Sequence, residues 1–481
     1  MLLSILTLAC APSPVVNNYY TTNVYEVGSD TGGTETIPGA ESDTGWQNIE
    51  PPNELVVTST VAELALDPFA TDGVVYWFGV SETQVAQMND DWENAWYEDW
   101  YGAVYEVDDE GDSATGTDHL YIRTPNGNVA DYGECQTNVV GQSSGVTWTS
   151  TTIPNLSLDS NEFVDDQYFN TEEQLDHIRL NNGGVGSMFG EPLALAIWDA
   201  AGVPVPRSSY AFVGGTPWQD EDLLIPYIAV EVYKPTFCVE HADYFGGGCS
   251  SIWEWYGYDI SAGNVSSINQ YCEVHDGCTT TRLTEFATVV DEYAYQTGFM
   301  AATEDYFDWD SFQTQMCLSW YAQTGDDYVH NLNNIVMTEG NDGKFRIHPW
   351  SMDINAGLAW GGAWTGMDLW GWSTMSMSCQ YDAECWQETI DRCGEVLDLM
   401  ETVDPANTLL PELYERLSST TAPWGDDGGD GMIRSPDEGM YSTAYAFYAD
   451  RVELARAELA LYEMPTSGCG PWDTGCWDTG F

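Results

Sequence analysis

The first half of the chain carries the alternating and continuous apolar runs that are typical of β-strands. The strongest is Leu-Ile-Pro-Tyr-Ile-Ala-Val-Glu-Val-Tyr at residues 224–233, and Pro-Asn-Gly-Asn at 125–128 predicts a turn. A first sizeable helix is expected at residues 192–201, with Pro192 at its start and Gly202 after its end. The predicted strands are residues 54–62, 73–80, 118–123, 139–152 and 224–233.

In the second half, apolar residues recur at helical spacing. The predicted helices are residues 284–302, 310–321, 387–401, 411–418 and 441–463, with a cap expected at Asp310-Ser311. One β-hairpin interrupts them, because residues 334–338 and 344–348 flank the turn sequence Gly-Asn-Asp-Gly. Strands followed by helices predict an α+β fold, and a β-rich amino-terminal lobe, a helical carboxy-terminal lobe and a polar hairpin form a kinase-like, two-lobed plan.

The two ends of the chain differ from its body. Residues 1–9 are mostly apolar and lead to Leu8-Ala9-Cys10, which resembles a bacterial lipoprotein signal; an ordinary export signal is the alternative. We therefore expect an extracytoplasmic protein, in the cell envelope through a lipid anchor at Cys10 or secreted. Residues 10–54 are rich in Thr, Gly, Ser, Pro and acids and predict a flexible acidic linker. No later apolar run reaches the roughly 18 residues of a spanning helix.

Cysteine usage agrees with export. The chain has 12 cysteines, and setting aside Cys10 leaves 12 − 1 = 11, so one thiol is expected to be unpaired or to pair with another chain. No C-x2-C pair occurs and the six histidines are scattered, which argues against zinc. Close spacing predicts the disulfides Cys238–Cys249, Cys272–Cys278 and Cys469–Cys476, the last in a tail over residues 464–481, while Cys379, Cys385 and Cys393 are expected to share a loop.

Charge excludes several classes of partner. Lys plus Arg number 12 and Asp plus Glu number 77, so the net charge is 12 − 77 = −65. Such a surface repels phosphate backbones and anionic membranes, which excludes nucleic-acid binding through a basic patch. Hydrophobic residues make up 43% of the chain, so it can still bury a large core.

Several polar segments stand in an informative order. Together they resemble the CotH family of secreted and spore-coat atypical protein kinases, which has an "LNN…REKLAY…DAGLPAPR" stretch, then "WDGY…NNYYLY" and then "IPWDxDxxFG". The matching segments are residues 178–183, 191–194 and 199–207, then 326–328 and 333–336, then 345–353. The resemblance covers about residues 55–463 and implies an atypical kinase domain, with an amino-terminal lobe over about 55–235 and a carboxy-terminal lobe over about 236–463.

The residues of these segments suit phosphoryl transfer, which depends on positioning and charge stabilisation. Asp326, Asn333 and Asp353 supply two carboxylates and an amide, and the hairpin should bring its two ends, and therefore these side chains, together. The resemblance implies Asp326 as the catalytic base, with Asp327 as a competitor. It also implies that Asp353 and Asn333 are ligands of Mg²⁺ or Mn²⁺.

ATP is the cofactor that the resemblance implies, with contacts expected from Asn333, Glu231, Lys234 and Arg179. Arg207 is weighed as a phosphate contact against pairing with a local acid. The expected reaction is transfer of the γ-phosphate to Ser or Thr of an extracytoplasmic protein.

Two departures support a different reading. Ser351 stands where the family has the first Asp of its "PWDxD" motif, and residues 153–159 contain no lysine where the family has a basic strand. The alternative is therefore a catalytically inactive envelope structural or adhesion protein with a CotH-like fold, for which the acidic run Asp426-Asp427-Gly428-Gly429-Asp430 is the candidate Ca²⁺ site. A hydrolase is disfavoured because no G-x-S-x-G or H-E-x-x-H signature is present.

Overall fold

The computed structural model describes most of the chain between residues 55 and 462, all of it within one unit, Ile49–Phe481. The expected signal and anchor at Cys10, the linker, the acidic run at 426–430 and the tail at 464–481 lie outside the described residues. The described ranges are 55–64, 66–81, 83–86, 88–89, 116–117, 119–140, 154–183, 187–215, 224–274, 277–353, 355–356, 358, 367–422 and 438–462.

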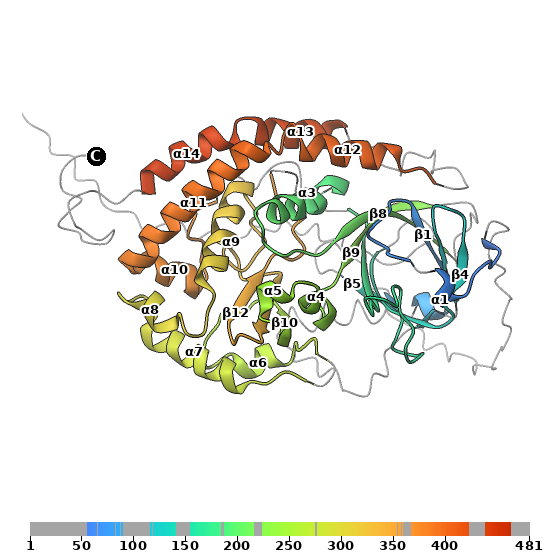
Figure 1. Ribbon diagram of the computed structural model, residues 1–481, viewed down its shortest axis with the longest axis horizontal. Helices are drawn as coiled ribbons and strands as arrows, with labels where there is room; N and C mark the ends of the chain where they lie inside the picture. Colours follow the sequence, from blue (N-terminus) through green and yellow to red (C-terminus); the bar gives the residue numbers. More distant parts are fainter. Residues whose placement is uncertain are drawn as a thin grey trace, which may run out of the picture. The chain divides into compact units, whose positions relative to one another are not determined.

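A nine-stranded sheet dominates the first half of the chain (Figure 1). Its strands are β1 (Val74–Gly79), β2 (Gly116–Thr117), β3 (His119–Arg123), β4 (Val129–Asp131), β5 (Cys135–Val140), β6 (Asn155–Asp159), β7 (His177–Asn181), β8 (Ser208–Gly215) and β9 (Ile225–Glu231). Their order is β2-β5-β6-β7-β9-β8-β1-β3-β4. Neighbouring strands are antiparallel except β1 and β8, which are parallel.

Most of the strand predictions agree with this sheet. The patterns at 73–80, 118–123 and 224–233 become β1, β3 and β9, and the turn at 125–128 forms with the Gly127 N–H donating to the Thr124 carbonyl at 2.9 Å. The strand predicted at 54–62 is wrong, because the helix α1 (Val61–Leu64) begins there. Thr60 and Glu63 form a reciprocal capping box that satisfies the donors at the start of this helix.

The helix α3 (Ser187–Ala200) starts five residues earlier than predicted, with Pro192 inside it. Proline lacks the N–H that would bond to the carbonyl four residues before it. That carbonyl belongs to Met188, and it accepts a hydrogen bond from the Tyr210 hydroxyl of β8 at 3.1 Å. A side chain of the neighbouring sheet therefore replaces the hydrogen bond that the proline removes.

A second sheet of three strands lies within the second half of the chain, in the order β10 (Cys249–Trp255), β11 (Ile335–Gly340), β12 (Phe345–His348). The last two strands form the predicted hairpin, with Val336 paired to His348 and Glu339 to Phe345. The hairpin is confirmed, whereas β10 was not expected from the sequence pattern.

Helices make up most of the remaining described chain. The predicted helix at 284–302 is divided, because Tyr295 and Gly298 adopt left-handed φ values of 59° and 84°. The helix α11 is longer than predicted and lies beside α9 and α14 (Figure 1). The helices are α4 (Pro235–Glu240), α5 (Ala242–Phe245), α6 (Val265–Asn269), α7 (Thr281–Tyr293), α8 (Phe299–Thr303), α9 (Trp309–Ala322), α10 (Thr374–Tyr381), α11 (Ala383–Val403), α12 (Leu409–Ser419), α13 (Glu438–Ala449) and α14 (Arg451–Tyr462).

The α9 helix is capped by Asp308, which accepts the Ser311 N–H, and not by the predicted Asp310-Ser311. The buried apolar side chains of the described residues form three clusters: the largest among the helices and the small sheet, a second on the nine-stranded sheet and a small third one that includes Val75, Trp77 and Phe212. The structure is thus a mixture of a large sheet and helices, as the α+β prediction requires. Among the described residues, no helix is both long enough and apolar enough to cross a membrane.

Four disulfides link described cysteines. Cys238–Cys249 and Cys272–Cys278 form as predicted, and Cys379–Cys385 is a third. The expectation that Cys379, Cys385 and Cys393 share a loop is wrong, because all three lie on α10 and α11 and Cys393 pairs with Cys317 of the adjacent helix α9. Disulfides in this number are typical of proteins from oxidising compartments outside the cytoplasm.

Candidate functional site

A polar cavity of about 490 Å³ lies between β5, β6 and β7 of the large sheet and residues from the second half of the chain. Its volume is in the range of small-molecule sites. It is lined by Gln136, Asn138, Val140, Ser157, Asp159, His177, Arg179, Val232, Lys234, Glu254, Trp255, Tyr256, Tyr271, Glu273, Asp326, Asn333, Asn334, Ser351 and Asp353. Five of the six predicted site residues are in this lining: Asp326, Asn333, Asp353, Lys234 and Arg179.

One wall of this cavity is formed by side chains at alternate positions of the neighbouring strands β5, β6 and β7. Side chains two residues apart on a strand point to the same face, and residues paired across strands share that face. One row runs across the sheet through Gln136, Asp159 and His177, and the next through Asn138, Ser157 and Arg179. Polar residues at alternate positions of β5, β6 and β7 are therefore the sequence signal of this wall.

The opposite wall comes from the loops at the two ends of the β11–β12 hairpin. The Asp326 carboxylate accepts hydrogen bonds from the side-chain amides of Asn331 at 2.5 Å, Asn333 at 2.8 Å and Asn334 at 3.1 Å. Three amide donors fix both carboxylate oxygens in one orientation. Because the amide nitrogen of Asn333 is the donor, its amide oxygen is left as a potential metal ligand.

Backbone strain gathers at the same wall. Asn334 and Ser351 have left-handed φ values of 48° and 50°, and both line the cavity. Asn334 also donates to the Asp326 carbonyl at 3.0 Å and to the Ser351 carbonyl at 3.5 Å. Such conformations persist where the surrounding structure holds them, and they are common at functional sites. Asn334 thereby ties the loop before the hairpin to the loop after it.

The segment that carries Asp353 rests on helix α3. Asn355 donates its amide hydrogens to the carbonyl oxygens of Gly190 at 2.8 Å and Met352 at 2.6 Å. The approach is close at Gly190, where a Cβ would lie 2.6 Å from the Asp353 carbonyl oxygen. Asp353 is buried, so α3 sets the position of one acidic residue of the cavity.

The next residue of α3, Glu191, joins this helix to the sheet. Its carboxylate accepts the Asn181 amide of β7 at 2.8 Å, and burial raises its pKa above the usual value. Both residues belong to the segments that carry the family resemblance. They connect the strand bearing Arg179 to the helix that supports Asp353.

Asp327 lies outside the cavity lining, in contrast to Asp326. It is buried, and its carboxylate accepts the Thr324 hydroxyl at 3.1 Å and both the backbone N–H and the Nδ1 of His330, at 2.8 and 3.0 Å. Burial alone would raise the Asp327 pKa, but the charge and hydrogen bonds of His330 outweigh it and lower the pKa. Asp327 therefore shapes the loop, while Asp326 faces the cavity.

Glu231 is the predicted site residue that the structure does not bring to the cavity. It is paired with Ile178 on β7, whereas Arg179 is paired with Val230, so Glu231 and Arg179 lie on opposite faces of the sheet. The Glu231 carboxylate accepts two side-chain hydrogen bonds from Arg207, at 2.9 and 3.1 Å. The structure therefore does not bring Glu231 to the cavity with the other predicted site residues, and Arg207 pairs with local acids.

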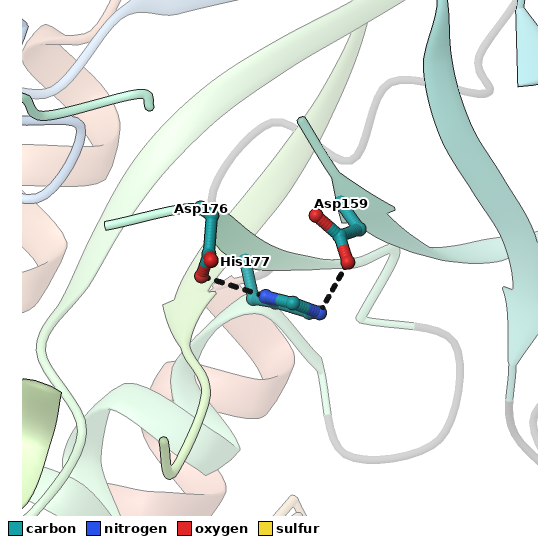
Figure 2. A group of neighbouring side chains, drawn as sticks. All are labelled: Asp159, Asp176 and His177. Carbon is teal, nitrogen blue, oxygen red and sulfur yellow. Dashed lines mark hydrogen bonds and ion pairs between the residues drawn. The ribbon is translucent and has the colours of Figure 1, made fainter. Parts of the chain in front are cut away.

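His177 was not singled out from the sequence. Figure 2 shows its ring between two carboxylates, with Nε2 2.8 Å from Asp159 and Nδ1 2.7 Å from Asp176. Burial would lower the His177 pKa, but the two hydrogen bonds outweigh burial and raise it. These three residues place potential ligand atoms within 4.8 Å of one another. A doubly hydrogen-bonded imidazolium has no lone pair for a metal, so the arrangement is an ion-pair clamp.

The remaining cations of the lining are also paired with acids. Lys234 lies 2.7 Å from Glu273; burial would lower its pKa, but the charge of Glu273 outweighs burial and raises it. Arg179 lies 3.5 Å from Glu254. The lining holds three cations, counting His177, and five acids (Asp159, Glu254, Glu273, Asp326 and Asp353), so its net charge is 3 − 5 = −2.

No protein-family profile and no curated protein matches the chain. Among solved structures, the chain is similar to a Helicobacter pylori proinflammatory kinase, CtkA, at 10% sequence identity and a TM-score of 0.29. The match covers 64% of this chain and 95% of that chain. A similarity at this level carries no argument about activity.

The donor set of the cavity suits a hard divalent cation. Asp326, Asp353 and Asn333 offer carboxylate and amide oxygens, which Mg²⁺, Mn²⁺ and Ca²⁺ prefer. The cavity lining contains no cysteine, and its one histidine is held in the clamp. The residues present therefore fit a hard cation better than zinc or copper.

Proposed function

We propose that this protein is a metal-dependent phosphotransferase of the CotH type, which transfers the γ-phosphate of ATP to a Ser or Thr hydroxyl of an extracytoplasmic protein. One observation carries the proposal: Asp326, held by three asparagine amides, shares a polar cavity with Asn333 and Asp353. These residues are far apart in the sequence from Arg179 and Lys234, which line the same cavity. Two acids, an amide and nearby cations are the parts that phosphoryl transfer needs.

Asp326 is the proposed general base. Its fixed orientation allows one carboxylate oxygen to accept the proton of an incoming hydroxyl while the amide donors hold the group in place. Reorientation of the base during the reaction is then small, which is how positioning contributes to rate. Asp327 is unsuited to this role because its carboxylate is buried against His330.

Asp353 and Asn333 are the proposed ligands of Mg²⁺ or Mn²⁺. The metal would neutralise phosphate charge, which a cavity with a net charge of −2 cannot do by itself. Ser351 contributes a hydroxyl where a carboxylate would strengthen metal binding, so we expect a weaker metal site than in a protein with two aspartates there.

The resemblance of the motifs and the four disulfides support the rest of the proposal. We propose a two-lobed kinase arrangement, export, and anchorage through lipidated Cys10, with an exported protein as substrate. Oxidised cysteines in this number fit a protein that works outside the cytoplasm.

The test is phosphate transfer by the purified protein. Labelled ATP with Mg²⁺ or Mn²⁺ is incubated with a panel of exported proteins, and incorporation is compared with the Asp326→Asn and Asp353→Asn variants. The proposal predicts metal-dependent label on Ser or Thr in the wild type alone. Equal incorporation in all three proteins, or none in any, would overturn it.

A second candidate function is an inactive envelope protein with the same fold. Two observations favour it: Ser351 lines the cavity, and strand β6, which lines the cavity through Ser157 and Asp159, contains no lysine. Thermal stability separates the two candidates. Stabilisation by ATP only in the presence of Mg²⁺ or Mn²⁺ supports the enzyme, and stabilisation by Ca²⁺ without a nucleotide effect supports the inactive protein.

A further inference from the structure

We infer that Arg179, and not Lys234 or His177, is the residue of this cavity that binds the phosphate groups of the nucleotide. The inference rests on the proposed function and assigns one cation to one task. The cavity offers three candidate cations, and they differ in how far their hydrogen-bonding capacity is already used.

His177 has no capacity left while its clamp holds. A protonated imidazole has two N–H donors, and these meet Asp159 at 2.8 Å and Asp176 at 2.7 Å. Two carboxylates surround one positive charge, so the clamp as a whole carries a net charge of −1. A phosphate approaching His177 would meet more negative than positive charge.

Lys234 is committed to a close ion pair. Its Nζ lies 2.7 Å from Glu273 Oε2, and its side chain is 18% exposed. The charge of Glu273 raises the Lys234 pKa in spite of burial, which means that the pair is already favourable without a ligand. A phosphate would have to displace Glu273 before it could use this ammonium group.

Arg179 has donors to spare. A guanidinium has five N–H donors, and the contact with Glu254 Oε1 at 3.5 Å is long for a hydrogen bond. The same oxygen accepts a shorter hydrogen bond from the Trp350 indole, at 2.6 Å. Among the described residues, the buried Nε of Arg179 has no hydrogen-bond partner.

Its position also favours Arg179. The guanidinium carbon lies over the Trp350 ring, 4.5 Å from its centre, and this cation–π contact holds the group in place. Trp350 directly precedes Ser351 and stands three residues before Asp353, so the stacked guanidinium lies beside the segment that supplies the proposed metal ligand. A planar, oriented arginine fork can bind two phosphate oxygens at once.

The experiment measures binding of ATP, ADP and adenosine by titration calorimetry in the presence of Mn²⁺. The Arg179→Met variant loses a charge-assisted contact. We therefore expect its affinity for ATP to fall about tenfold or more, while its affinity for adenosine stays unchanged. Arg179→Lys keeps the positive charge but not the planar guanidinium, so we expect its ATP affinity to lie between those of the wild type and Arg179→Met. Arg392, a half-buried residue of α11 that pairs with Asp310, lies outside the cavity lining, so Arg392→Met should bind ATP like the wild type.

A paired variant, Lys234→Met with Glu273→Gln, removes the second ion pair without leaving an unpaired acid. The inference predicts an ATP affinity close to that of the wild type. It is overturned if Arg179→Met binds ATP normally, if adenosine and ATP binding fall together, or if the paired variant loses as much affinity as Arg179→Met. Failure of the wild type to bind ATP would instead remove the proposed function, and the inference with it.

Discussion

The backbones of Gly190 and Asp353 meet so closely that a Cβ at position 190 would lie 2.6 Å from the Asp353 carbonyl oxygen. Real Cβ atoms do not approach a backbone oxygen at that distance, so a larger residue must move either α3 or the segment around Asp353. A helix in the sheet-bearing half of the chain thus determines where a proposed metal ligand of the other half can stand.

We therefore predict that Gly190→Ala destabilises the protein by about 1–3 kcal/mol, as overpacked sites do, and weakens Mn²⁺ binding. Gly394→Ala on α11 is the matched control, since a Cβ there meets nothing within 4 Å. It should raise stability by up to about 1 kcal/mol, because alanine is the better helix former. Denaturant unfolding and metal titration check both variants, and normal metal binding by Gly190→Ala would contradict the prediction.

Asp326 and Asp327 are neighbours in sequence with opposite expected phenotypes. Asp326→Asn should keep the fold and reduce phosphate transfer by about 10²-fold or more, the usual contribution of a general base. Asp327→Asn removes a buried charge partner of His330 and should lower the unfolding free energy instead. Steady-state rates and urea unfolding of the two variants distinguish the roles. The assignment is wrong if Asp327→Asn is stable and inactive.

The His177 clamp predicts a specific pH dependence of stability. Its folded pKa is raised above the ordinary value of 6.5, so its contribution is complete below pH 6.5 and is lost as pH rises through the folded pKa. The difference in unfolding free energy between the wild type and His177→Gln should therefore shrink from pH 6.5 upward. Unfolding curves of both proteins from pH 5 to 9 measure this, and a difference that grows with pH would refute the clamp.

The Arg207–Glu231 pair should be structural. Glu231 is buried, and Arg207→Met would remove the cation that balances its carboxylate and keep only the hydrogen bond from the backbone N–H of residue 207, at an expected loss of about 3 kcal/mol. Adding Glu231→Gln should recover part of that loss, because the uncompensated charge disappears. A double-mutant cycle by urea unfolding gives the coupling, and additive effects would show that the two side chains act independently.

The disulfides on the helices should differ in strength. Cys317–Cys393 closes a loop with a separation of 76 residues and Cys379–Cys385 one of 6. Chain-entropy estimates give stabilisation of about 4.5 and about 2 kcal/mol, respectively. Replacing each pair by two alanines and measuring the unfolding free energy tests this order; an equal loss for both pairs would argue that loop entropy is not the main factor.

The sequence was informative where local signals fix geometry. The Gly-Asn-Asp-Gly turn predicted the hairpin, and Asn333 and Asp353, which lie just beyond its two ends, line the same cavity. The choice between Asp326 and Asp327 could not be made in this way, because adjacent loop residues differ only in which one faces the cavity.

Features that depend on the pairing of strands distant in sequence could not be predicted from the sequence. The His177 clamp depends on the pairing of β6 with β7, which no local pattern specifies. The face of the sheet on which Glu231 lies could not be predicted for a related reason, since it depends on the pairing with Ile178 and not on the pattern of its own strand. Strand β10 was not predicted, because only a short alternation of apolar residues follows Cys249-Ser250-Ser251.

The excess of acids in the cavity lining has a consequence for the order of events. A nucleotide that arrives alone meets a net charge of −2 in a protein of charge −65 and is repelled. Moderate salt screens this repulsion over about 10 Å and should accelerate nucleotide entry, the reverse of its effect on enzymes with basic active sites. Divalent cations are attracted by the same field, so they should enter the cavity before the nucleotide or bound to it.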